Sequence, residues 1–531
     1  MSGLDLVVSG GLLVDGTEAP GRRADVGISG DRVVAIGDLE AAGSSDRIDA
    51  RDHVVAPGFV DLHAHSDLTL LSDGRGRSKV RQGVTTEVIG NCGLGAAPAP
   101  LSRAQAVRRA VALIDLDPAV EWGWQGMAGY REALTAARPA LNVAPLCGHV
   151  ALRTAVAGDR AEVLAPAEVA ALEALADGAL EEGAIGLSTG LMHPPARFAD
   201  GPELEALGRA AARHDALLAV HLRDYSDRLL SAVEEALAVA RATGCRLQVS
   251  HLAVAGRRNW GSVARALDLV DAARAEGLDV GVDIYPYLAG SANLSQLLPG
   301  WAQEGGAAAI VGRLSDPATR SRIRAEWATS LHLTWDEVHV SLADGPLADA
   351  TLGRSVAAGA ADLGMDPDEA ALELIVRTDD RVQMVAFGRS AEDLRAVLTH
   401  PAASIGSDGL ALDPDGATGA GRPHPRSYGC YPRLLGRVVR EEGLLTLERA
   451  IAMSTAVPAG RAHLPDRGVL RSGTFADIVV LDPAGILDLA TFEAPATFPR
   501  GLRDVIVNGT PVVRDGAQLD DARPGRVLAA G

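Results

Sequence analysis

Lysine is almost absent from this sequence. Lys79 is the only lysine, and arginine supplies the rest of the positive charge. A phosphate-binding P-loop needs a lysine, and so does a pyridoxal Schiff base. Lys79 lies in the polar segment RGRSKVRQ, before a predicted strand rather than at the end of one. The sequence therefore disfavours both of these kinds of site.

Cysteine is scarce, and long apolar runs are missing. The four cysteines, Cys92, Cys147, Cys245 and Cys430, are too few and too scattered to form a disulfide framework. Residues 1–10 show neither a basic start nor an apolar core, and no run of about 18 apolar residues follows. We expect a reduced, cytoplasmic protein without a signal peptide or a membrane span.

Aromatic residues and net positive charge are also low. Aromatics make up 3% of the chain, whereas glycine occurs 59 times, which suits many turns and alanine-rich helices. A net charge of −19 argues against a nucleic-acid partner, because phosphate binding needs a basic face. With 531 residues and 47% apolar content, the chain can bury a large core, and we expect one big domain plus a smaller one.

Both ends of the chain carry hairpin signals. Alternating segments with glycine-containing turns occur near the N-terminus at Leu4–Val14 and Asp25–Ile36, and near the C-terminus at Phe475–Leu481 and Asp504–Val513. Isolated hairpins are marginal in water. We therefore predict that residues 1–56 and 463–531 form one small β-sandwich domain; two independent terminal caps are the alternative.

The middle of the chain, residues 57–462, alternates short apolar segments with amphipathic ones. The predicted strands are Phe59–Leu62, Thr85–Gly90, Asn142–Cys147, Ala184–Ser188, Leu217–His221, Arg246–Ser250, Asp279–Tyr285 and Ala403–Ser407. Helical segments such as Pro166–Glu182 and Arg228–Thr243 lie between several of them. Eight strands with helical crossovers predict a (β/α)₈ TIM-like barrel, with an open doubly wound sheet as the alternative.

One segment breaks this alternation. Residues 290–345 lie between the seventh and eighth strands and contain Trp301, Trp327 and Trp335. The segment is too long for a βα loop, so we predict an insertion over the barrel mouth that could act as a lid. A further apolar run, Val382–Phe387, also lies between these strands.

Metal-ligand side chains gather at the predicted strand ends, where barrel enzymes keep their chemistry. His63 and His65 follow the first strand and point to the same side, because strand residues i and i+2 share a face. Each remaining candidate also follows a strand: Cys92 the second, His221 the fifth with Arg223 just beyond, His251 the sixth and Asp408 the eighth. Imidazoles, a thiolate and a carboxylate suit Zn²⁺ better than magnesium or calcium.

One or two zinc ions are possible, because the number of ligands exceeds what one tetrahedral ion needs. Many dinuclear hydrolases bridge their metals with a carbamylated lysine. Lys79 is badly placed for this task, so Cys92 is the better candidate bridge.

These residues resemble the amidohydrolase superfamily and, within it, the D-aminoacylase (N-acyl-D-amino-acid deacylase) family. The resemblance covers nearly the whole chain and includes GFVDLHAH, GVTTEVIGNCG, AIGLSTG, VHLRD, QVSH, DIYPY, SIGSDG, HPRSYG and the C-terminal AVPAGRAHLPDRGVLRSGTFADIVVLDP. The Asn-Cys-Gly of the second strand is its specific marker, since most superfamily members lack a cysteine ligand there.

The resemblance implies a role for each matching residue. Cys92, His221 and His251 would hold a tightly bound zinc ion, and His63 and His65, sharing Cys92, a weaker second metal. Asp408 would be the catalytic aspartate. The implied substrate contacts are Arg426 at the α-carboxylate, Ser291, and Tyr285 or Tyr287. His193 and Arg223 are further expected substrate contacts. A guanidinium suits a carboxylate because it can bind both oxygens at once.

Two departures from the family pattern leave the preferred substrate open. Ala253 stands where the family usually has a lysine, and His193 stands where a tyrosine is common. The expected reaction is zinc-dependent hydrolysis of small N-acyl-D-amino acids to a carboxylate and a free D-amino acid. Because no basic cluster is visible, the sequence favours a neutral or hydrophobic side chain. The alternatives are a cyclic-amide hydrolase, similar to hydantoinase or dihydroorotase, and a non-catalytic scaffold. The oligomeric state stays open.

Overall fold

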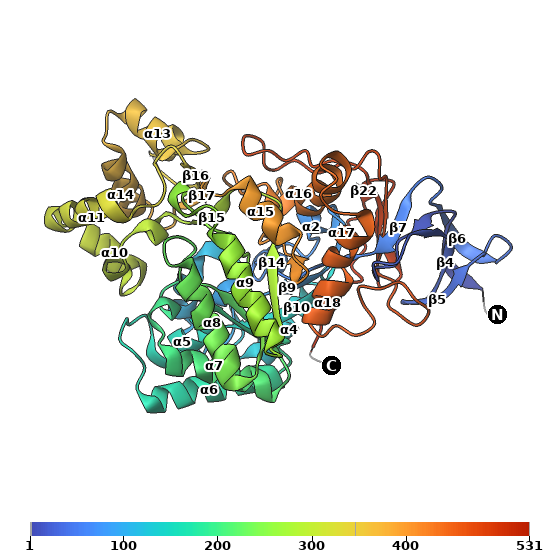
Figure 1. Cartoon of the computed structure of the whole chain (residues 1–531), viewed down its shortest axis with the longest axis horizontal. Helices are drawn as coiled ribbons and strands as arrows, with labels where there is room; N and C mark the ends of the chain where they lie inside the picture. Colours follow the sequence, from blue (N-terminus) through green and yellow to red (C-terminus); the bar gives the residue numbers. More distant parts are fainter. Residues whose placement is uncertain (1–2, 346, 530–531) are drawn as a thin grey trace.

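The computed structural model describes residues 3–345 and 347–529 and is built around a parallel β barrel (Figure 1). Its strands are β8 (Phe59–Asp61), β9 (Val84–Ile89), β10 (Asn142–Gly148), β11 (Gly186–Gly190), β12 (Leu217–His221), β13 (Arg246–Val249), β14 (Val280–Ile284) and β18 (Ala403–Ile405). Neighbours pair in the order β18-β14-β13-β12-β11-β10-β9-β8. A parallel bridge between Ala64 and Gly409 links the two edge strands. The eight predicted strands and the barrel are confirmed.

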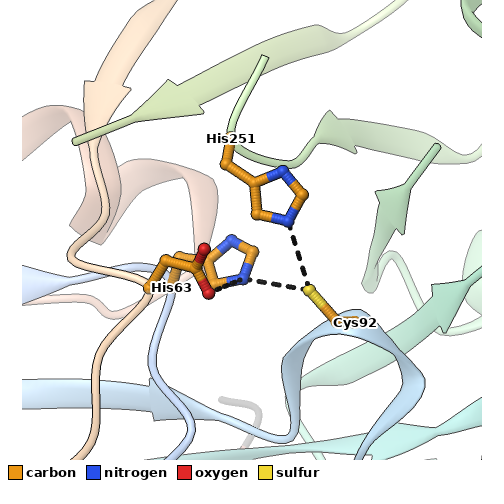
Figure 2. Close-up of side chains that lie close together, drawn as sticks. His63, Cys92 and His251 are labelled. Atoms are coloured by element: carbon orange, nitrogen blue, oxygen red, sulfur yellow. Dashed lines mark hydrogen bonds and ion pairs between the residues drawn. The ribbon is translucent and has the colours of Figure 1, made fainter. Parts of the chain in front are cut away.

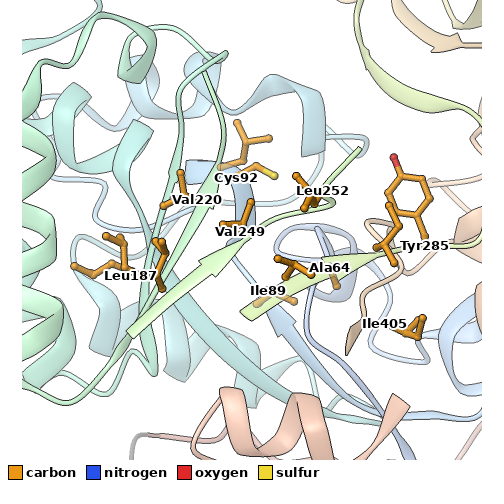
Figure 3. Close-up of a cluster of buried hydrophobic side chains, with 14 of the residues drawn as sticks. Ala64, Ile89, Cys92, Leu187, Val220, Val249, Leu252, Tyr285 and Ile405 are labelled. Carbon is orange, nitrogen blue, oxygen red and sulfur yellow. The ribbon is translucent and has the colours of Figure 1, made fainter. Parts of the chain in front are cut away.

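The barrel strands are apolar on both faces, as expected for a parallel sheet covered by helices. Along β12, Leu218 and Val220 join the large core between barrel and helices, and Leu217 and Ala219 join a second cluster. Figure 3 shows Val220 and Val249 among the side chains that pack beside Cys92. By strand alternation His221 shares the face of Leu217 and Ala219, so the core packing fixes its direction.

Helices surround the barrel, and the longest of them lie side by side along its outside (Figure 1). The helices around the barrel include α5 (His149–Ala157), α6 (Pro166–Glu181), α7 (Gly201–Arg213), α8 (Leu229–Thr243), α9 (Ser262–Ala275), α15 (Ala391–Leu398) and α17 (Leu447–Ser454). Further helices are α1 (Thr69–Ser72), α2 (Arg77–Val80), α3 (Ala104–Ala110), α4 (Met127–Ala136), α16 (Arg426–Arg433) and α18 (Ala456–Arg461). The described residues contain no helix long and apolar enough to cross a membrane.

Both chain ends contribute to a pair of small sheets beside the barrel. One has the order β5 (Arg32–Gly37), β4 (Asp25–Ser29), β1 (Leu4–Ser9) and β6 (Ser44–Asp49). The other has the order β22 (Ala517–Gln518), β21 (Thr510–Arg514), β20 (Leu502–Val507), β19 (Ile478–Leu481), β7 (Val54–Pro57), β2 (Leu12–Leu13) and β3 (Arg22–Arg23). Side chains of both sheets, such as Ile28 and Ile478, share one apolar core.

The terminal β domain confirms the predicted union of the two ends, because N-terminal β7 pairs antiparallel with C-terminal β19. The hairpins β4–β5 and β20–β21 also form as expected. The hairpin predicted over residues 4–14 is wrong: β1 and β2 belong to different sheets. The turn at Ser9-Gly10-Gly11 carries the chain from one sheet to the other. The exact ends of the domains, at residues 56 and 462, stay predictions.

The insertion lies at the opposite end of the molecule from the terminal sheets (Figure 1). Its elements are β15 (Gly290–Asn293), α10 (Gly306–Leu314), α11 (Pro317–Ser330), β16 (Val338–Leu342), α12 (Ala348–Thr351), α13 (Val356–Leu363), α14 (Pro367–Arg377) and β17 (Gln383–Ala386). These elements bury an apolar core of their own. Since β17 is the central strand of its sheet, the unit continues well beyond the predicted end at Gly345. The apolar run Val382–Phe387 is the strand that completes it.

Candidate active site

The candidate ligands lie at the carboxyl ends of the barrel strands, but most of them sit just past the last paired residue. Cys92 lies in the short 3₁₀ turn η1 (Asn91–Gly93) after β9. Three of the residues adopt positive φ angles, which are 55° at Cys92, 35° at His251 and 53° at Asp408. Such conformations are costly for residues other than glycine, and they gather at functional sites.

Close packing of backbone fixes the turn that carries Cys92. At Gly190, the last residue of β11, a Cβ atom would lie 2.0 Å from the Cys92 carbonyl oxygen. Ser188 of the same strand accepts from the Gly93 N–H at 2.9 Å, and its hydroxyl donates to the Gly90 carbonyl. Strand β11 therefore fixes the backbone turn that carries the Cys92 thiol.

Four buried side chains converge at this point (Figure 2). His63, Cys92, His251 and Asp408 each offer a ligand atom, and these atoms all lie within 4.8 Å of one another. The Cys92 sulfur is 3.2 Å from Nε2 of His63 and 3.4 Å from Nε2 of His251. The thiol thus contacts both imidazoles, whose ring centroids lie 4.9 Å apart.

His65 and His221 flank this group. Nε2 of His65 is 2.9 Å from Oδ1 of Asp408. The His221 ring lies 4.7 Å from the His251 ring, measured between centroids. Both ring nitrogens of His221 are buried, and so is Nδ1 of His65; none of these atoms has a hydrogen-bond partner within the described part of the chain. Unpaired buried imidazole nitrogens are rare in folded proteins, and a metal ion would supply the missing partner.

The electrostatics of the group favour a bound cation. Burial opposes ionisation of the Cys92 thiol, but His63, His221 and His251 outweigh it and hold the thiol pKa well below its usual range. Burial likewise opposes the charge of Asp408, whose pKa falls well below normal because Arg426 and His251 are close. A thiolate and a carboxylate inside a ring of imidazoles form a donor set that suits zinc.

Asp283 of β14 is a site residue that the sequence reasoning missed. Its Oδ1 lies 3.1 Å from Nδ1 of His63 and accepts a hydrogen bond from the backbone N–H of His251 at 2.8 Å. A carboxylate on the far nitrogen of a metal-ligand histidine fixes the ring orientation. The only available signal was its place in DIYPY, on the strand next to that of His251.

Lys79, in the polar segment before β9, is held by buried carboxylates. It is fully buried on α2, and its Nζ lies 2.9 Å from Asp61 and 2.7 Å from Glu87. The same ammonium donates to Ser407 at 2.8 Å. Lys79 thus joins β8 and β9 to the residues that precede Asp408, and it lies beneath the candidate ligands rather than among them.

The ligand group opens into a cavity of about 490 Å³ that lies between the barrel mouth and the insertion. Tyr285, Ser291, Arg426 and His193 line it, so four expected substrate contacts face the same space. Nη1 of Arg426 lies 2.6 Å from Oδ2 of Asp408.

Two of the expected substrate contacts have other partners. Tyr287 lies outside the main cavity and donates its hydroxyl to Asp488 at 2.9 Å, because β14 ends at Ile284 and strand alternation no longer holds beyond it. Arg223 lines the cavity, but it pairs with Glu235 at 2.9 Å and also donates to two backbone carbonyls.

The two positions that depart from the family pattern both line the cavity. His193 is buried against His221, and Nδ1 of its ring lies 3.0 Å from the Gln296 amide. Burial, together with the neighbouring His221 imidazole, lowers the pKa of His193 to about 3, so its ring is neutral. Ala253 presents only a methyl group to the cavity wall.

Comparisons with known proteins agree with this architecture. The chain matches the family described as Amidohydrolase family over residues 46–513. It is 40% identical to the N-acyl-D-glutamate deacylase of Alcaligenes xylosoxydans xylosoxydans, an alignment that covers 99% of this chain and 96% of that protein. It is 37% identical to the D-aminoacylase of the same organism, with 99% and 97% covered.

One solved structure shares the fold over the full length. It is the N-acyl-D-glutamate deacylase of Bordetella bronchiseptica, complexed with zinc and a phosphonate inhibitor that mimics the tetrahedral intermediate of its reaction. The two chains are 37% identical and superpose with a TM-score of 0.85, and the match covers 100% of each.

The buried position of Lys79 generates a prediction about stability. Lys79→Met leaves Asp61 and Glu87 buried without their cation, so we expect the free energy of unfolding to fall by about 3–5 kcal/mol. Chemical denaturation followed by circular dichroism measures this change. Arg77→Met is the matched control on the same helix, because its partially exposed ion pair with Asp520 contributes about 0–1 kcal/mol. Equal losses in the two variants would contradict the role assigned to Lys79.

Proposed function

Because the chain belongs to the amidohydrolase family, and within it to the D-aminoacylase (N-acyl-D-amino-acid deacylase) family, we propose that it hydrolyses the amide bond of N-acyl-D-amino acids. The products are a carboxylate and a free D-amino acid. The observation that carries this proposal is the buried group His63, Cys92, His251 and Asp408 at the floor of a cavity that also contains Arg426.

We assign zinc as the metal. Cys92, His221 and His251 would hold the tighter ion, and His63 and His65, sharing the Cys92 sulfur, a weaker second one. The unpaired ring nitrogens of His221 and the contacts of the thiol with both His63 and His251 support this assignment. When bound there, zinc would lower the pKa of a water molecule towards ~7 and polarise the amide carbonyl.

Asp408 is the group that moves the proton. Its carboxylate lies within 4.8 Å of the other candidate ligands and faces the cavity, so it can accept the proton of the attacking water. It then delivers that proton to the nitrogen of the leaving amino acid. Its hydrogen bonds to His65 and Arg426 keep the carboxylate ionised and correctly oriented before the reaction.

Arg426 is the receptor for the α-carboxylate. The guanidinium is buried at the cavity wall, and only one of its terminal nitrogens contacts Asp408, so its other donors are available to a substrate. This places the amide bond between a group that fixes the amino acid and the ligands that activate the water. Ser291 and the neutral His193 lie in the same cavity as further hydrogen-bonding groups.

The surroundings of Lys79 disfavour a cyclic-amide hydrolase with a carbamylated lysine bridge. Its Nζ is held by Asp61, Glu87 and Ser407, and none of these belongs to the group that converges on Cys92. A non-catalytic scaffold is disfavoured by the presence of every candidate ligand.

A substrate panel tests the proposed reaction. The purified protein is loaded with zinc and incubated with N-acetyl-D-amino acids, the matching L enantiomers and hydantoins, and the release of free amine or ring-opened product is measured. We expect hydrolysis of the D compounds, loss of activity after chelation and recovery on adding zinc back. Hydrolysis confined to hydantoins, or no hydrolysis with a full complement of zinc, would contradict the proposal.

The role of Asp408 gives a separate prediction. Asp408→Asn keeps the size of the side chain but removes its capacity to accept a proton, so we expect kcat to fall by about 10²–10⁴-fold. Zinc content, measured by mass spectrometry of the metal, should stay near the wild-type value. Asp413→Asn, at a buried aspartate that pairs with Arg75, is the matched control and should keep its activity. Substantial turnover by Asp408→Asn would show that another group carries the proton.

A further inference from the structure

Five arginines from distant parts of the chain line the cavity: Arg197, Arg223, Arg228, Arg389 and Arg426. Three of them have a carboxylate partner, Arg223 with Glu235, Arg228 with Asp224 and Arg426 with Asp408. Arg197 and Arg389 have none within ion-pair distance among residues 3–345 and 347–529. Of these two, Arg389 is the one that lies against the same tyrosine as Arg426.

The backbone around Arg389 is firmly held. The residue follows β17 and directly precedes Ser390, whose hydroxyl caps helix α15. On its other side, the Gly388 carbonyl accepts from the Gly256 N–H at 2.9 Å and from the Trp260 indole at 3.0 Å. A guanidinium on such a support is preorganised, so binding an anion costs little ordering.

The Arg389 guanidinium and that of Arg426 lie against the same tyrosine. Their central carbons are 4.8 Å and 4.6 Å from the centre of the Tyr285 ring. Gly290 leaves the space that Arg389 occupies, since a Cβ there would lie 3.1 Å from Nη2 of the arginine. The cavity therefore holds two guanidinium groups on one aromatic ring, at the end that contains the ligand group.

The donors of Arg389 are not all used by the protein. Its Nη1 is buried and has no hydrogen-bond partner among the residues that the structure describes. A buried donor without a partner costs free energy, and a charged one costs more, because water no longer solvates it. An anion bound at this point would restore the lost interactions.

The carboxylates at the rim of the cavity do not neutralise Arg389. Asp227 pairs with Arg258 at 2.6 Å, and Glu326 accepts from the Trp301 indole at 3.0 Å. On the inner wall, Ala253 and Val254 are apolar. The positive charge of Arg389 is thus left for a ligand.

We propose that Arg389 binds a side-chain carboxylate of the substrate, so that the enzyme prefers N-acyl-D-amino acids with an acidic side chain. The inference rests on the proposed function, in which Arg426 takes the α-carboxylate. A dicarboxylate then has one guanidinium for each acid group, with Tyr285 between them. A neutral substrate leaves the buried Arg389 guanidinium without a partner, and this lowers kcat/KM for that substrate.

This assignment replaces the expectation of a neutral or hydrophobic side chain. That expectation came from the lack of a basic cluster along the sequence. Arg389 and Arg426 are 37 positions apart in the chain, and they come together because the segment after β17 and the start of α16 both line the cavity.

Three substrates and one variant test the inference. We expect zinc-loaded wild type to prefer N-acetyl-D-glutamate over its isosteric amide N-acetyl-D-glutamine by about 10- to 150-fold in kcat/KM, the range for one hydrogen bond to a charged group. Arg389→Met should abolish this preference, mainly by raising KM for the glutamate substrate. Hydrolysis of N-acetyl-D-methionine should stay near the wild-type rate, because that substrate has no side-chain charge.

Arg197→Met is the matched control, since Arg197 is the other cavity arginine without a carboxylate partner; it should keep the preference for glutamate. Three results would overturn the inference while leaving the proposed function intact: equal hydrolysis of the glutamate and glutamine substrates by wild type, an equal loss on all three substrates in Arg389→Met, or a loss of the preference in Arg197→Met alone. If the wild-type protein hydrolyses none of the three substrates, the proposed function itself is contradicted.

Discussion

The structure depends on how a group of buried electron-pair donors is kept together. Two imidazoles, a thiol and a carboxylate lie within 4.8 Å of one another, and two further imidazoles stand beside them. Such a group is unfavourable by itself, because the thiolate and the carboxylate repel each other and the His221 nitrogens have no partners. A divalent cation removes both difficulties at once. The arrangement of these side chains therefore suits a bound divalent cation, which the proposed amide hydrolysis also requires.

The barrel supplies the rigidity that such a site requires. Lys79, Asp61 and Glu87 form a fully buried ion pair network beneath the ligands, and it ties the first two strands to the segment that carries Asp408. Asp283 orients His63, while the close approach of Gly190 fixes the Cys92 turn. The insertion adds what the barrel lacks, since β15 and the residue after β17 bring Ser291 and Arg389 to the cavity. The candidate metal ligands and the proposed contact for the substrate side chain therefore come from different parts of the fold.

Periodicity and strand-end positions were sufficient to predict the eight barrel strands, the shared terminal domain and the convergence of five further candidate residues on Cys92. These are local signals, because parallel strands place their carboxyl ends at one edge. Contacts between segments that are far apart in the sequence could not be predicted from these local signals. The polar segment around Lys79 gave no sign of its buried ion pairs, and Asp283 carried no pattern of its own. The end of the insertion depended on β17 pairing with a strand about 90 residues earlier. Tyr285 and Tyr287 could be told apart only after the strand end at Ile284 was known.

The central claim is that a cysteine thiolate from the second barrel strand holds the metal. Extended X-ray absorption fine structure at the zinc edge of the zinc-loaded protein tests it most directly. We predict one sulfur neighbour at about 2.3 Å together with nitrogen or oxygen neighbours at about 2.0–2.2 Å. The sulfur contribution should vanish in Cys92→Ala and persist in Cys245→Ala, where an equally buried thiol lies outside the site. A zinc spectrum of the wild-type protein without sulfur would contradict the account.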